Sequence, residues 1–180
     1  MHLPNFHDPK YLADLTHLMI PIKLKIVSGG QTGADRAALD WAGWCPSGRL
    51  AEDGTIDSKY LLTEMPDGGY RRRTKANVLD SDATLIASLA STLTGGSKET
   101  ALFAHRLNKP HLHVHPGMDW KAALALWQPS QHAITLNVAG PRQSRAPGIG
   151  AFVIQVLDGI LEIRRMTLST RLDLSTLLPS

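Results

Sequence analysis

The chain has 180 residues, enough for one domain that buries roughly 70 per cent of its unfolded surface without covalent cross-links. Its single cysteine, Cys45, excludes an internal disulfide and a cysteine-based zinc site and indicates a reducing compartment. The formal charge of +3, from 19 Lys and Arg against 16 Asp and Glu, is too small to predict nucleic-acid binding. The sequence shows no basic leader pattern and no stretch near the roughly 20 apolar residues of a membrane span. We therefore expect a soluble, cytoplasmic protein that binds neither nucleic acids nor membranes.

Strand and helix signals alternate along the chain. Residues 1–23 are expected to be an N-terminal extension with a short helix at 9–19. Apolar runs predict strands at 24–27, 44–45, 83–88, 111–115 and 133–139. Helices are expected at 33–43, 70–79, 120–127 and 147–164, with one more that ends at Leu107, and a long loop at 46–67. Residues 165–180 form a tail, an edge strand or a subunit contact.

This alternation predicts an α/β fold of the Rossmann-like kind, a single doubly wound, mainly parallel sheet with helices on both faces. We assign residues 24–164 to the ligand-binding domain, between the extension at 1–23 and the segment at 165–180.

The first strand leads into a glycine-rich turn and then a helix. Glycines let the backbone approach a ligand closely, and the free N–H groups and positive dipole at a helix start favour an anion. The spacing is neither the GxGxxG dinucleotide fingerprint nor the GxxxxGK[ST] P-loop. The alternative is a plain turn whose glycines serve packing alone. Candidate ligand-binding residues here are Ser28, Gly29, Gly30, Gln31, Thr32, Gly33 and Arg36.

Two further strands end in turns of similar character. TGGSKET follows the third strand and contributes Gly95, Gly96, Ser97, Lys98 and Thr100. AGPRQSRAPG follows the fifth and contributes Gly140 and Arg142, with Arg145 as a second guanidinium able to clamp a phosphate. Ligands of open α/β sheets bind beyond the carboxyl ends of the strands, so we expect the three loops to converge on one crevice.

The helix expected at 70–79 carries Arg73, Asn77 and Asp80 along one face. We expect Arg73 to meet a phosphate and Asn77 to meet a ring or sugar, whereas Arg71 and Arg72 are expected to form a solvated face.

Other polar groups leave alternatives open. Either Arg49, Glu52 and Asp53 close over a ligand, or Asp53 and Gly54 only make a turn. His111, His113 and His115 share one face of a strand, but residues four apart on a strand lie roughly 13 Å apart and do not share one ion. We therefore expect no metal site. Cys45 is either buried or near a sulfur-rich ligand.

Several segments together resemble the molybdenum cofactor carrier family, in order and spacing from about residue 24 to residue 163. They are IVSGGQTGADRAALDWA (26–42), GWCPSGRLAEDG (43–54), YRRRTKANVLDSDATLI (70–86), TGGSKET (94–100) and LNVAGPRQSRAPGI (136–149). The resemblance implies a Rossmann-like fold related to lysine-decarboxylase-like, cytokinin-activating phosphoribohydrolases. It also implies reversible binding and protection of molybdenum cofactor, a molybdopterin with a terminal phosphate, by a homo-oligomer, either a dimer or a tetramer.

The phosphoribohydrolase relatives provide an enzymatic alternative, hydrolysis of a nucleoside monophosphate. Their second glycine motif is PGGxGTxxE, with the glutamate as acid or base. Here Thr94 stands at the proline position. With Thr100 aligned to the threonine of the motif, which takes one extra residue after Gly96, Glu99 stands at the third glycine and Phe103 at the glutamate, and phenylalanine carries no proton. We therefore expect a binding protein for an anionic pterin or a nucleotide, with no catalytic residue. A third possibility is a nucleotide-sensing module.

Overall fold

The computed structural model describes residues 24–38, 43–66, 69–127 and 133–176. The helix expected at 9–19 lies outside these ranges, as does part of the helix expected at 33–43, of which α2 (Ala34–Ala37) is described. No helix of the described ranges is long and apolar enough to cross a membrane.

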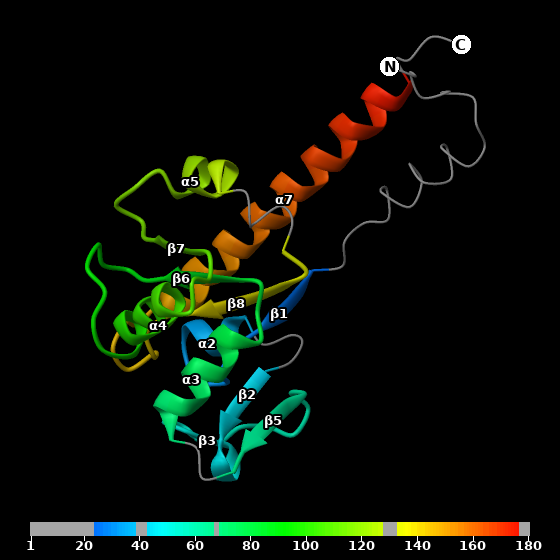
Figure 1. Ribbon diagram of the computed structural model, residues 1–180. Coiled ribbons are helices and arrows are strands. Elements are labelled where there is room, and N and C mark those ends of the chain that lie inside the picture. Colours follow the sequence, from blue (N-terminus) through cyan, green and yellow to red (C-terminus); the bar gives the residue numbers. More distant parts are fainter. Residues whose placement is uncertain (1–23, 39–42, 67–68, 128–132, 177–180) are drawn as a thin grey trace, which may run out of the picture.

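A parallel four-stranded sheet forms the centre of the molecule (Figure 1). Its strands are β1 (Lys25–Val27), β8 (Thr135–Ala139), β6 (Ala83–Ala87) and β7 (His111–Val114), adjacent in that order. Every residue of β6 is buried, as expected for an inner strand covered on both faces. The predicted α/β, Rossmann-like fold class is confirmed.

Helices pack on both sides of this sheet. The first group is α2 and α5 (Trp120–Leu126), which both contact α7 (Ile149–Thr176), and the second is α3 (Tyr70–Leu79) with α4 (Gly95–Arg106). Buried residues of α7, including Val153, Val156 and Ile160, join those of β6 and β8 in one apolar cluster. Burial of each such side chain contributes about 1.5 to 3 kcal/mol.

The last helix is longer than expected. Helix α7 continues through residues 165–176, which the sequence left as a tail, an edge strand or a subunit contact, and its C-terminal half projects beyond the sheet (Figure 1). The segment is thus helical and not an edge strand over those residues, and the tail and the subunit contact stay predictions.

Two corrections concern residues 43–66. Strand β2 (Gly43–Pro46) pairs in parallel with β5 (Leu62–Met65) in a separate sheet and does not join the central one. The segment expected to be one long loop also contains a 3₁₀ turn, η1 (Ser47–Arg49), and a small hairpin of β3 (Leu50–Ala51) and β4 (Gly54–Thr55).

An apolar core and the hydrogen bonds of one arginine stabilise this small subdomain, and neither could be predicted from the sequence of its short strands. Cys45, Ile56 and Leu62 form its own apolar core. The guanidinium of Arg49 donates hydrogen bonds of 2.8 to 3.1 Å to four backbone carbonyl oxygens, those of residues 56, 57, 60 and 62. Arg49 therefore stabilises the segment. Cys45 is an apolar core residue here, and its burial raises the pKa of the thiol.

Candidate functional site

A cavity of about 690 Å³ opens at the carboxyl edge of the central sheet. The strands β1, β8 and β6 are adjacent and parallel, so the loops that follow them lie at the same edge. Residues of all three loops line the cavity, and α3 supplies a further wall. Ten of the predicted binding residues border it: Gly29, Gln31, Arg73, Asn77, Gly95, Gly96, Ser97, Thr100, Gly140 and Arg142. The expected convergence of the three loops is present, and we call this cavity the cleft.

The N-terminus of α4 faces the cleft without a side-chain cap. Thr94 precedes the helix in an extended conformation and forms no capping hydrogen bond. Gly95 has a φ of 51°, in the left-handed region, and a Cβ placed on Gly95 or Gly96 would meet no heavy atom within 4 Å. The first N–H groups of a twelve-residue helix are therefore open to a ligand, in the arrangement that favours anions.

Two arginines from the loop after β8 also border the cleft. Neither Arg142 nor Arg145 forms an ion pair with an acidic side chain of the described residues. The guanidinium carbon of Arg142 lies 4.4 Å from the ring centroid of Tyr70, and that of Arg73 lies 6.0 Å from the same ring. Tyr70, absent from the predicted set, is 42% exposed and presents a flat aromatic surface beside two cations.

A buried ion pair supports the wall formed by α3. Arg73 Nη1 donates to Asp35 Oδ2 across 2.9 Å, and the two side chains are 8% and 10% exposed. Burial raises the pKa of Asp35 above its ordinary value, whereas the charge of Arg73 and the N–H of Gln31 act in the opposite direction. A Cβ on Gly29 would lie 1.2 Å from Arg73 Nη1, so a side chain at this position would displace the guanidinium from its place beside Asp35.

Two buried polar atoms of cleft-lining residues have no hydrogen-bond partner in the described structure, Gln31 Oε1 and Arg73 Nε. The amide nitrogen of Gln31 donates to the carbonyl oxygen of Leu50 at 2.9 Å, which fixes the orientation of the amide. An unpaired buried polar atom destabilises the protein by about 1 to 3 kcal/mol.

Other predicted residues lie outside the cleft. Thr32, Gly33 and Arg36 border a second cavity with Glu52 and Asp53. Arg36 donates to both carboxylate oxygens of Asp53 at 3.0 Å and also to the carbonyl of Gly30.

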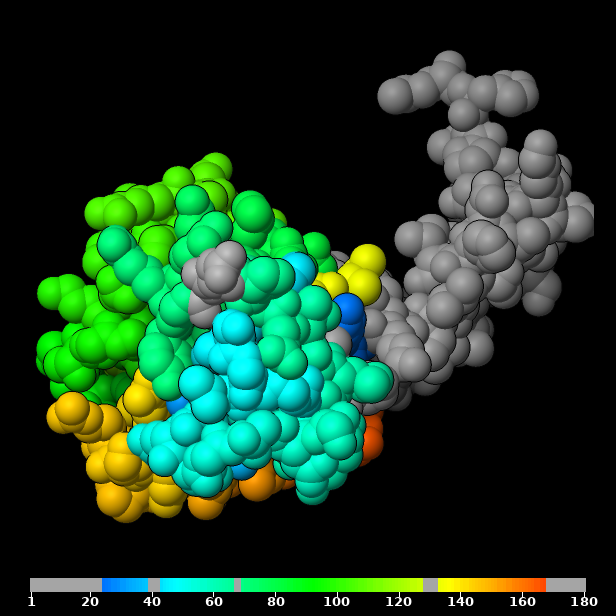
Figure 2. Space-filling model, turned by 90° about the horizontal axis from the view of Figure 1, so that it is seen from below, coloured from blue at the N-terminus to red at the C-terminus, as the bar shows by residue number. Residues whose placement is uncertain are grey.

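Glu52 accepts hydrogen bonds from the hydroxyls of Thr32 and Ser144 and from the Ser144 N–H. These bonds lower the pKa of Glu52. In Figure 2, cyan atoms of this hairpin region lie against the yellow and orange atoms of the segment after β8. Glu52 and Asp53 thus tie the hairpin to the outer side of the two loops and do not line the cleft.

Ser28 and Lys98 are likewise not among the residues that line the cleft. Ser28 is buried, and its hydroxyl donates to the carbonyl of Val138 at 2.9 Å, which joins the ends of β1 and β8. Lys98 lies exposed on the first turn of α4.

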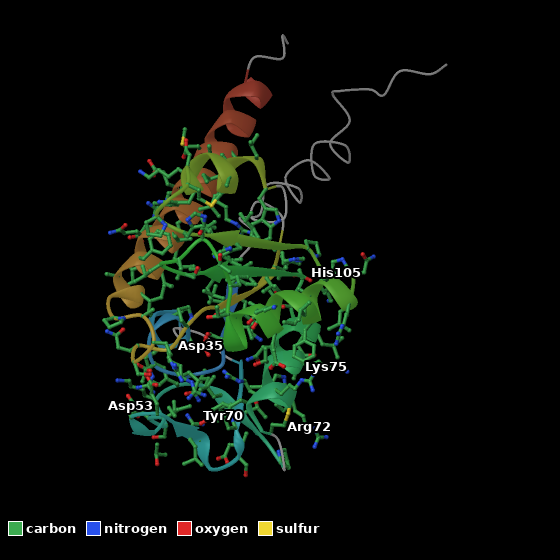
Figure 3. All side chains as sticks on the ribbon, turned by 90° about the vertical axis from the view of Figure 1, so that its left-hand side faces the viewer. Asp35, Asp53, Tyr70, Arg72, Lys75 and His105 are labelled. Carbon is green, nitrogen blue, oxygen red and sulfur yellow. The ribbon has the colours of Figure 1, made fainter. Side chains whose placement is uncertain are left out.

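The polar residues on and next to helix α3 contact β2, contact α4 or lie on the outer side of the helix. Asn77 borders the cleft, yet its amide accepts from the N–H of Trp44 at 2.8 Å and donates to the carbonyl of the same residue, so it holds β2 against α3. Asp80 accepts from the Trp44 indole N–H. Arg71 Nε forms an ion pair with Glu99 Oε1 at 3.2 Å, so the negative charge beside the proposed anion site has a partner. Figure 3 shows Arg72 and Lys75 on the outer side of the helix, away from Asp35.

Phe103 and the histidines lie away from the cleft lining. Phe103 packs with Val78 and Ala104 between α3 and α4. His113 Nε2 lies 2.6 Å from the Ser88 hydroxyl, and burial, with a smaller effect of His115, lowers the pKa of His113. Within the described ranges no group of three or more His, Cys, Asp or Glu is placed to hold a metal ion.

The fold and the cleft together define a Rossmann-like α/β protein with a ligand-sized cavity at the carboxyl edge of its parallel sheet. The chain belongs to the circularly permutated YpsA SLOG family, whose model matches residues 26–161. This membership, with the similarity below, confirms the resemblance found in the sequence.

The chain is also similar to a crystal structure from Syntrophus aciditrophicus SB named "Putative molybdenum carrier protein". The two sequences are 45% identical, the match covers 80% of this chain and 96% of the other, and the TM-score is 0.69. No curated protein matches the chain.

Proposed function

We propose that this protein is a non-catalytic binding or carrier protein for an anionic pterin, with molybdenum cofactor as its cargo. The observation that carries the proposal is the cleft itself, where an uncapped helix N-terminus and two arginines without acidic partners among the described residues face one cavity. Such a site favours a negatively charged group such as the terminal phosphate of a molybdopterin.

The size and chemistry of the cleft agree with this cargo. A cavity of about 690 Å³ lies within the range of small-molecule sites, roughly 300 to 1,000 Å³. The open space at Gly95 and Gly96 admits a phosphate group to the backbone, and Tyr70 offers a surface on which a planar ring can stack. The name of the similar protein from Syntrophus aciditrophicus includes molybdenum, which favours this ligand over other anions.

The enzymatic alternative is hydrolysis of a nucleoside monophosphate. Phe103, at the position of the catalytic glutamate in phosphoribohydrolases, packs between two helices and offers no proton. Glu99 does border the cleft, but its carboxylate pairs with Arg71. We therefore propose that nucleotides compete for the same site without being cleaved.

One experiment separates the two functions. The purified protein is incubated with nucleoside monophosphates and, separately, with an anionic pterin such as pterin-6-carboxylate. Binding at a fixed stoichiometry without release of free base is the expected result. Steady release of base over many turnovers would replace the carrier function with an enzymatic one. The homo-oligomer implied by the resemblance and the cytoplasmic location expected from the composition stay predictions.

A further inference from the structure

A smaller cavity of about 330 Å³ adjoins the cleft, and we call it the side cavity. The two cavities meet at Thr94, Ser97, Pro141 and Arg145, which line both of them. The rest of the side cavity is lined by the segment after β6 and by Ala146. The side cavity therefore lies at the same carboxyl edge of the sheet, next to the cleft and open to a ligand that extends out of it.

The two cavities differ in charge. Arg145 is the one charged residue of the described ranges that lines the side cavity, and it stands where the two cavities meet. The cleft is lined by both signs of charge, including Asp35, Glu99 and Arg142. An anionic group is therefore favoured at the boundary, whereas an uncharged group is favoured farther inside the side cavity.

The lining of the side cavity combines apolar and hydroxyl groups. Leu89 and Leu93 supply apolar surface. The hydroxyls of Thr92 and Thr94 form no hydrogen bond with the described residues and are available to a ligand. A volume of about 330 Å³ is at the lower end of the range of small-molecule sites, roughly 300 to 1,000 Å³. This lining suits a small uncharged group that has both a flat apolar ring and hydroxyls, as a nucleoside has.

Two arginines mark the path from one cavity to the other. Arg142 lines the cleft and not the side cavity, whereas Arg145 lines both. The N–H of Arg145 donates to the carbonyl of Arg142 at 3.0 Å, so the two residues stand at the two ends of one turn. Neither guanidinium has an acidic partner in the described part of the chain. A diphosphate offers one phosphoryl group to each arginine, whereas a single terminal phosphate in the cleft leaves the side cavity without a ligand group.

We infer that the side cavity binds the nucleoside end of a cargo in which a diphosphate joins the pterin to a nucleoside. This inference rests on the proposed function and specifies the form of the cargo. The pterin lies in the cleft, the diphosphate lies at Arg142 and Arg145, and the base and the ribose lie between the apolar surface and the free hydroxyls of the side cavity.

The test measures what the full-length protein holds after purification from a host that makes both forms of molybdenum cofactor, with a terminal phosphate and with a linked nucleotide. Fluorescence after oxidation measures the pterin. Chromatography measures nucleoside monophosphate before and after hydrolysis of the diphosphate, and only the nucleotide that appears on hydrolysis is counted.

The variants Ala90→Trp and Thr92→Trp each place an indole in the side cavity at an exposed position that does not line the cleft. Two positions are used so that the loss of stability of one variant, measured by urea denaturation, does not decide the result. The matched control is Ala122→Trp, at an exposed position of α5 that lines neither cavity.

We expect equimolar pterin and linked nucleotide in the wild type and in Ala122→Trp. The two filling variants should keep the pterin, while the ratio of nucleotide to pterin falls by about tenfold or more. A wild type that holds pterin without linked nucleotide would overturn the inference and leave the carrier function intact, and so would filling variants with the wild-type ratio. A wild type without pterin would overturn the proposed function as well.

Discussion

Gly96 offers the clearest separation between folding and ligand binding. A Cβ added at this position meets no heavy atom of the described residues within 4 Å, and the residue lies on the first turn of α4 at the edge of the cleft. Gly96→Ala therefore introduces no clash. Because alanine loses less backbone entropy than glycine in a helix, the free energy of unfolding should stay the same or rise by up to about 1 kcal/mol.

The same substitution should weaken ligand binding. A phosphate or carboxylate that accepts hydrogen bonds from the N–H groups of this turn must approach the space that the new methyl group fills. Loss of one charge-assisted hydrogen bond weakens binding by about 1.5 to 3 kcal/mol, or roughly ten- to hundredfold. The fluorescence of pterin-6-carboxylate measures the affinity, and urea denaturation measures the stability.

Gly69→Ala serves as the matched control. Gly69 lies at the N-terminus of α3, also has no heavy atom of the described part of the chain within 4 Å of an added Cβ, and does not line the cleft. We expect its ligand affinity to equal that of the wild type. Unchanged affinity in Gly96→Ala would refute the argument that the ligand meets the backbone of α4, and equal losses in both variants would assign the effect to something other than the cleft.

Three further predictions concern charged residues. Arg142→Ala should weaken the binding of an anionic ligand by about 1.5 to 3 kcal/mol, and calorimetry that finds no change in affinity would show that Arg142 does not contact the ligand. Asp35→Ala should lower the free energy of unfolding in urea by about 3 to 5 kcal/mol because it leaves Arg73 buried without its partner, and adding Arg73→Met should recover part of the loss; a larger loss in the double variant would contradict this. Hydrogen bonds lower the pKa of Glu52 in the folded state, so its contribution to stability is present above its unfolded pKa and is lost as pH falls through the lower folded value. The Glu52→Gln variant should lack that component of the acid transition, and an NMR titration that finds an ordinary pKa for Glu52 would refute the assignment.

The central fold could be predicted because its elements are regular. Apolar runs that end in glycine loops mark β1, β6 and β8, and their parallel order places those loops at one edge. The β2–β5 sheet and the β3–β4 hairpin were missed because their strands have only four and two residues each. The four carbonyls bound by Arg49 are contacts that no local pattern reveals.

The site shows the same division between local pattern and long-range contact. Arg73 could be predicted as a cleft residue, and Tyr70, three positions earlier on the same helix, could have been added by the same spacing argument. Asn137, a buried polar residue between Leu136 and Val138, also lines the cleft and was a second unused signal. In contrast, the position of Arg36 depends on Asp53, seventeen residues away, and only the folded structure shows that this guanidinium lies outside the cleft.

The central claim is that the cleft holds an anionic pterin without converting it. The most direct measurement is the amount of oxidised pterin fluorescence and of molybdenum, per mole of protein, after purification from a host that makes molybdenum cofactor. We expect both in a fixed ratio to the wild-type protein and a strong reduction of both in Gly96→Ala. Wild-type protein free of pterin, or equal amounts in the two proteins, would contradict the claim.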